Sequence, residues 1–137
     1  MMLDLVFKNY TAQRAPAGIF FAKVVNAGLK TTKSKGKIEI SVNLVGEGKI
    51  KGLNKKHRKK NKSTDVLSFP LGDDSGDIFI CLSIAKKEAK RENISIEAKL
   101  AQLTVHGFLH LLGYDHERSV GGAKKMFALE NKILSKV

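Results

Sequence analysis

The segment HGFLHLLGYDH (106–116) constrains the fold of this chain most, because it places three of the four histidines in an almost wholly apolar stretch. Residues four apart share one face of an α-helix, so His106 and His110 can reach one metal ion. Gly113 can adopt a left-handed conformation that ends the helix and lets His116 close the site. Three imidazoles with an open fourth position are typical of a catalytic zinc centre.

The hydrophobic periodicity of the rest of the chain predicts an α+β fold. The helix that carries the histidines is apolar on nearly every face after residue 102, so we expect it to be central and buried. We expect one domain over residues 1–137, with a mixed sheet of about four strands and helices packed on it, in a metalloprotease-like arrangement. The predicted strands are 3–9, 37–45, 64–70 and 76–83; the predicted helices are 15–30 ending near Gly28, 47–58 as a short helix or turn, 84–92, 96–113 capped by Ser95, and 122–135.

The charge balance indicates an anionic partner. The chain has 25 Lys and Arg against 13 Asp and Glu, a formal net charge of +12. Without a lipid-binding amphipathic signature, this excess favours nucleic acid over a membrane. No apolar run reaches the length of a membrane span and no secretory signal precedes the first strand, so we expect a cytoplasmic protein. The single cysteine, Cys81, sits in an apolar strand and is expected to be a buried thiol.

The histidine spacing also matches the HExxHxxGxxH pattern of one branch of zinc metallopeptidases. Those peptidases carry a general-base glutamate where this chain has Gly107, which has no side chain. The metal geometry is therefore retained and the peptidase base is lost. A metallopeptidase-like hydrolase remains an alternative, against which Gly107 argues.

Three motifs in order carry a more specific resemblance. HGFLHLLGYDH, LNKKHRKKNKSTDVLSFP (53–70) and GDIFIC (76–81) resemble the signature of the YbeY family of bacterial ribosomal RNA maturation factors. The resemblance covers roughly residues 50–130. It implies a zinc-dependent endoribonuclease, with one zinc ion per chain, that cuts single-stranded RNA in the maturation of the small-subunit ribosomal RNA 3′ end and in ribosome quality control. Its implied partners are the small ribosomal subunit and assembly factors.

The same resemblance assigns roles to individual residues. His106, His110 and His116 match the family's metal ligands, and Arg58 matches an arginine important for catalysis in that family. A permanently charged, planar guanidinium suits the binding of a scissile phosphate. His57 stands where the family usually has tyrosine, and the segment after the last ligand is basic where the family tends to be acidic. These departures leave the substrate contacts open.

Two further predictions concern the surroundings of the site. Asp115 precedes the last ligand and is expected to orient a histidine through its free ring nitrogen, although a plain turn carboxylate is an equal alternative. A dense basic run before the third strand is expected to contact the RNA backbone, since such charges repel unless an anion relieves them; its predicted RNA-binding residues are Lys55, Lys56, Lys59, Lys60 and Lys62. The third functional alternative is a non-catalytic assembly factor that binds RNA through this run.

Overall fold

The computed structural model describes residues 2–114 and 120–137 of the chain. In chain order the nine elements of the described residues are β1 (Met2–Asn9), α1 (Gly18–Thr31), β2 (Lys37–Val45), α2 (Glu47–Arg58), β3 (Val66–Pro70), β4 (Ser75–Cys81), α3 (Leu82–Glu92), α4 (Ile96–Leu111) and α5 (Val120–Leu134). They alternate between strands and helices as far as β3, and those after β4 are all helical. No helix among the described residues is long and apolar enough to cross a membrane.

The four strands form one mixed sheet in the order β1-β2-β4-β3. Strands β1, β2 and β4 are parallel neighbours, whereas β3 pairs antiparallel with β4 at the edge of the sheet. The loop between β3 and β4 is short, as a hairpin connection requires. Strand β1 is joined to β2 through α1, and β2 to β4 through α2 and β3. The prediction of an α+β domain with a four-stranded mixed sheet and a 64–83 hairpin is confirmed.

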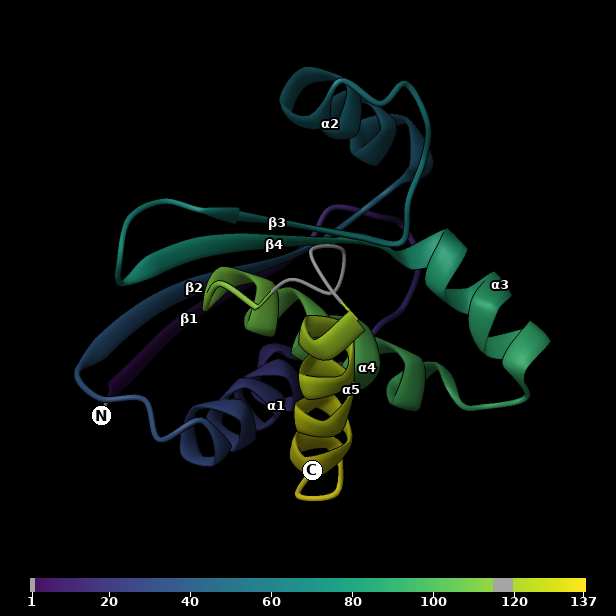
Figure 1. Ribbon diagram of the computed structural model, residues 1–137. Coiled ribbons are helices and arrows are strands. Elements are labelled where there is room, and N and C mark those ends of the chain that lie inside the picture. The colour runs from purple at the N-terminus through teal and green to yellow at the C-terminus, as the bar shows by residue number, and fades with distance from the viewer. Residues whose placement is uncertain (1, 115–119) are drawn as a thin grey trace.

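Helices cover the two faces of the sheet unequally (Figure 1). In this view α1, α4 and α5 lie below the sheet and α2 lies above it. The alternation of the strands explains both layers: Val42 and Ile78 point into the large core with α1 and α4, while Val45 and Cys81 point to the other face. There they form a small second cluster with Ile50 of α2.

Helix α4 is the central helix of the larger layer. Its side chains from Leu100 to Leu109 are almost all buried, and it contacts α1, α3, α5, β3 and β4. Ser95 caps its first turn by accepting a hydrogen bond from the backbone N–H of Ala98 at 3.0 Å. The predicted cap and the predicted burial of this helix are therefore confirmed.

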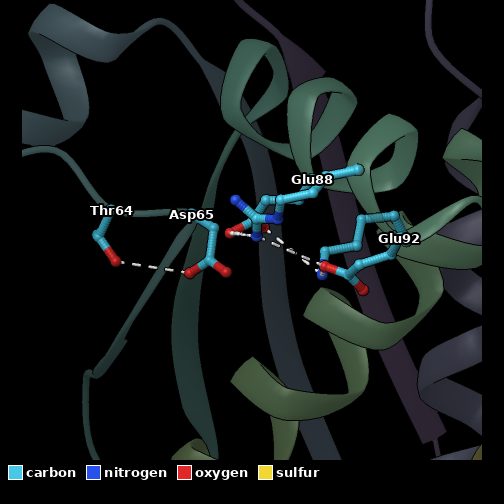
Figure 2. A network of polar contacts seen from close by, with 6 residues as sticks. Thr64, Asp65, Glu88 and Glu92 are labelled. Carbon is cyan, nitrogen blue, oxygen red and sulfur yellow. Dashed lines mark hydrogen bonds and ion pairs between the residues drawn. The ribbon is translucent and has the colours of Figure 1, made fainter.

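A cluster of charged side chains fixes α3 against α4 and against the beginning of β3 (Figure 2). The buried Lys99 Nζ lies 2.7 Å from a Glu92 carboxylate oxygen and 3.6 Å from one of Glu88. Figure 2 shows Asp65 directed toward Glu88 from the segment before β3. Burial raises the pKa of Glu88, and the neighbouring Asp65 carboxyl raises it further, against the opposing effect of Lys99.

Several predicted boundaries are wrong by a few residues, and three of them have a physical reason or bear on the site. Helix α1 does not end near Gly28 but continues to Thr31, because Gly28 is a contact residue and not a terminator: a Cβ there would lie 2.6 Å from Phe108 Cε2 of α4. The fourth strand ends at Cys81, and Leu82 already belongs to α3. The histidine helix ends at Leu111, two residues before the predicted Gly113.

Candidate functional site

The two histidines of α4 face one another. Their Nε2 atoms are 3.0 Å apart and their rings, with centroids 4.5 Å apart, are inclined at 78°. A zinc ion bonded to both at about 2.0–2.1 Å with a tetrahedral angle would separate these nitrogens by roughly 3.3 Å. His106 and His110 are half-buried, so the pair fits one metal ion with only a small adjustment and remains accessible to a substrate.

A glutamate on another helix holds one of these imidazoles. The Glu130 carboxylate of α5 accepts a hydrogen bond from His106, with its Oε1 2.7 Å from the ring Nδ1. Both side chains are largely shielded from solvent, with 22% exposed for the carboxyl-bearing side chain and 29% for the imidazole. The contact joins α5 to α4 on the side of the His106 ring away from His110.

The chain turns sharply after α4, as the site requires. Gly113 has φ +94°, and its N–H donates to the carbonyl of His110 at 3.0 Å. The N–H of Tyr114 donates to the carbonyl of Leu109 at 3.0 Å, so both carbonyls at the helix end are satisfied. The predicted left-handed glycine is confirmed. His116 and Asp115 lie outside the described residues, and within residues 2–114 and 120–137 no group of three His, Cys, Asp or Glu gathers as a metal cluster.

Position 107 has no room for a side chain. A Cβ on Gly107 would lie 2.8 Å from Ser68 Oγ and 3.0 Å from Ile78 Cγ2, because α4 rests directly on β3 and β4 there. The Ser68 hydroxyl donates to the Gly107 carbonyl at 2.9 Å and joins the edge strand to the histidine helix. A peptidase-type glutamate at this position is therefore sterically excluded in this packing.

The basic run forms the end of α2 and the loop that follows it. All five predicted RNA-binding lysines, and Arg58, are exposed, and no carboxylate of the described chain lies within 4.0 Å of any of them. The buried Asn54 holds this loop in place, since its Nδ2 donates to the carbonyl of Lys62 at 2.9 Å. The lysines therefore project from a fixed loop, and their charge is not neutralised by the described acidic side chains.

Arg58 is the last residue of α2, whereas the two described histidines lie on α4. Helices α2 and α4 cover opposite faces (Figure 1), and no hydrogen bond or ion pair joins Arg58 to another residue of the described chain. The neighbouring His57 ring is 4.7 Å from that of Phe69 in β3. Phe69 and Ser68 are neighbours on the edge strand and point to opposite sides of it. Helix α2 therefore meets one side of β3 through His57, and the histidine helix meets the other through Gly107.

Sequence reasoning missed Glu130. It lies 20 residues after His110, on a helix that was predicted only to pack through Met126, Leu129, Ile133 and Leu134. Met126 and Ile133 are indeed buried. The available signal was the position of Glu130 four residues after Met126, which places a carboxylate on the core-facing side of the helix.

Comparisons with known proteins give one consistent family. The family model described as "Endoribonuclease YbeY" matches residues 8–137 of the chain. A protein named endoribonuclease YbeY from Aquifex aeolicus is 43% identical, with 73% of this chain and 71% of the relative covered. One of the same name from Oenococcus oeni is 41% identical, with 82% and 80% covered.

A solved structure supports the same conclusion at the level of the fold. The solution structure of a Thermotoga maritima protein matches with a TM-score of 0.65 and 31% sequence identity, and the match covers 99% of this chain and 88% of that one. The overall fold is thus shared with an experimentally determined structure. With a family model that matches nearly the full length and relatives above 40% identity, this chain belongs to the YbeY family.

Proposed function

We propose that this protein is a metal-dependent endoribonuclease that cuts single-stranded RNA in the maturation of ribosomal RNA. The observation that carries the proposal is the pair of Nε2 atoms 3.0 Å apart on a central helix. Its relatives named endoribonuclease YbeY support the reaction type. We further propose that His116 completes the ligand set and that one zinc ion binds per chain, in keeping with three imidazoles and an open position.

The histidines and Arg58 have different roles in the proposed reaction. Zinc at such a site supplies Lewis acidity, which increases the acidity of a water molecule and polarises a phosphoryl oxygen. His106 and His110 hold it on a helix whose buried contacts prevent reorientation. Arg58 binds the scissile phosphate or its neighbour through two parallel N–H donors and stabilises the negative charge that develops on the phosphoryl oxygens.

The placement of these groups suggests a path for the RNA. The RNA chain crosses the edge of the sheet at β3. Its backbone runs along the lysines of α2, and its scissile phosphate lies between Arg58 and the histidines. Phosphate contacts of this kind do not depend on base identity, which suits a single-strand preference without a strict sequence code.

Cleavage of a labelled single-stranded RNA that spans a ribosomal RNA precursor end tests the proposal. We expect the zinc-loaded wild type to cut, His110→Ala to be inactive, and Arg58→Ala to lose about 100–1000-fold in rate, the usual effect of removing a charge-stabilising donor. Arg14→Ala is the matched control, because Arg14 is exposed in the loop after β1 and forms no ion pair within the described chain.

The outcomes separate the alternatives. Equal cleavage by all four proteins would mean that a contaminant cuts the RNA and would refute the assignment. RNA binding without cleavage by the zinc-loaded wild type would favour the non-catalytic assembly factor. Chelator-sensitive cleavage of an unstructured protein in place of RNA would favour the peptidase alternative, against the packing at Gly107.

A further inference from the structure

We infer that Glu130 is a positioning residue that fixes the tautomer and the orientation of His106 for metal binding. This inference rests on the metal site proposed above, although its first consequence concerns the metal-free protein. The carboxylate is contributed by α5, which the ligand motif does not include, and it contacts His106 on the ring nitrogen opposite the one that faces His110.

The hydrogen-bonding chemistry determines which nitrogen carries the proton. A carboxylate offers only acceptor oxygens, so the 2.7 Å contact requires Nδ1 of His106 to be the donor. A neutral imidazole has a single N–H, so Nε2 of His106 carries a lone pair. This nitrogen lies 3.0 Å from His110 Nε2, and the two nitrogens together would hold a metal ion. Without an acceptor on Nδ1, the ring could carry its proton on Nε2 and block the ligand position.

The surroundings of Glu130 favour this role over that of a surface salt bridge. The chain has 25 Lys and Arg, yet none in the described residues lies within 4.0 Å of the Glu130 carboxylate, whose ion-pair partner there is His106. Met126 and Ile133, one turn before and three residues after Glu130, are 1% and 0% exposed and fasten this face of α5 to the core. The carboxylate is thereby held on a rigid element, as a group that must orient a ligand should be.

The expected effect on metal binding follows from similar sites. Carboxylates that accept from a ligating histidine typically contribute 10–100-fold in metal affinity. We therefore expect Glu130→Met, which conserves much of the side-chain volume without an acceptor, to weaken zinc binding by that factor. Glu130→Gln keeps an acceptor oxygen, so it should retain the tautomer and lose less affinity.

Two measurements test the inference. Long-range ¹H–¹⁵N correlation spectra of the metal-free protein report which ring nitrogen of His106 is protonated. Competition with a chromophoric chelator gives the zinc affinity. The variants are Glu130→Met, Glu130→Gln and the control Glu97→Ala, which removes an exposed carboxylate from the first turn of α4. Urea unfolding of each variant reports any general loosening of α5.

The expected result is an Nδ1–H tautomer in the wild type, the Gln variant and the control, with the Nε2–H form appearing in the Met variant together with its 10–100-fold loss of zinc affinity. Wild-type tautomer and affinity in Glu130→Met would overturn the inference while leaving the metal site intact. If no protein binds zinc, the proposed metal site fails, and the tautomer spectra still decide the inference. Equal effects of the Met and Gln variants on affinity, with equal losses of stability, would indicate a purely structural role and also overturn it.

Discussion

Replacement of Gly107 by alanine tests whether close packing of α4 on the sheet dictates a glycine beside the first histidine. In an open helix interior this substitution stabilises by up to about 1 kcal/mol, because glycine is the poorer helix former. At position 107 the new Cβ would meet Ser68 Oγ at 2.8 Å and Ile78 Cγ2 at 3.0 Å. Overpacking of this kind costs about 1–3 kcal/mol.

The hydrogen bond between Ser68 and the Gly107 carbonyl adds to the cost. Moving the helix away from β3 weakens this 2.9 Å contact, for about a further 1 kcal/mol at most. The weakened hydrogen bond and the gain in helix propensity roughly cancel, so we expect Gly107→Ala to lower the free energy of unfolding by about 1–3 kcal/mol. Gly52→Ala is the matched control, because Gly52 lies inside α2 with no heavy atom within 4 Å of a built Cβ; it should raise the free energy of unfolding by up to about 1 kcal/mol.

Urea unfolding at neutral pH, followed by circular dichroism, measures both changes. The double variant Gly107→Ala/Ser68→Ala adds a second check, since removing the hydroxyl relieves the 2.8 Å approach and should make the pair less destabilising than the sum of the single changes. If Gly107→Ala stabilises the protein as much as Gly52→Ala does, the packing argument for position 107 is wrong.

Three further predictions follow from the charged groups. The folded-state pKa of Glu88 is raised, so its contribution to stability is complete below its unfolded pKa and is lost as pH rises through the folded pKa. Urea unfolding should therefore show Glu88→Gln gaining stability relative to the wild type between about pH 4 and about pH 8. A stability difference that stays constant over this range would contradict the argument. Lys99→Met leaves the Glu88 and Glu92 carboxylates without their buried cation and should destabilise the protein by about 1–3 kcal/mol. Lys87→Met, whose pair with Glu47 is exposed, should cost less than about 0.5 kcal/mol. Similar losses for the two variants in thermal unfolding would refute this difference between the buried and the exposed pair. Replacing Lys55, Lys56 and Lys59 by Gln should reduce the salt dependence of single-stranded RNA binding. The slope of log affinity against log salt concentration should fall by about 0.7 for each phosphate that the variant no longer neutralises, while the same change at the exposed Lys23, Lys30 and Lys35 should leave it unchanged. Equal slopes would indicate that the whole basic surface binds RNA without a defined path.

Much of the fold was accessible from the sequence because it depends on local periodicity. Strict alternation predicted residues 37–45 as a strand, and β2 has these bounds. The Ser95 cap and the left-handed Gly113 were likewise predicted, since capping and turn chemistry act within a few residues. The spacing of His106 and His110 also determined that both rings would lie on one face of one helix.

Other features were decided by contacts between residues far apart in the chain. Gly28 reads as a helix terminator in the sequence, yet it continues α1 because Phe108 of α4 packs where its side chain would be. The order β1-β2-β4-β3 is set by which faces can be buried together, which periodicity does not specify. The same reason places α2 and the histidine helix on opposite sides of the edge strand β3.

The partner of His106 illustrates the division most clearly. The sequence by itself determined the two imidazoles of α4, because their meeting requires only the 3.6-residue period of a helix. The sequence suggested only Asp115 as a carboxylate that could orient one of the histidines, and Asp115 lies outside the described residues. The described structure brings Glu130 to 2.7 Å from His106 Nδ1. That contact depends on how α5 packs across α4, and the packing results from burial of Met126 and Ile133 in a core assembled from the whole chain.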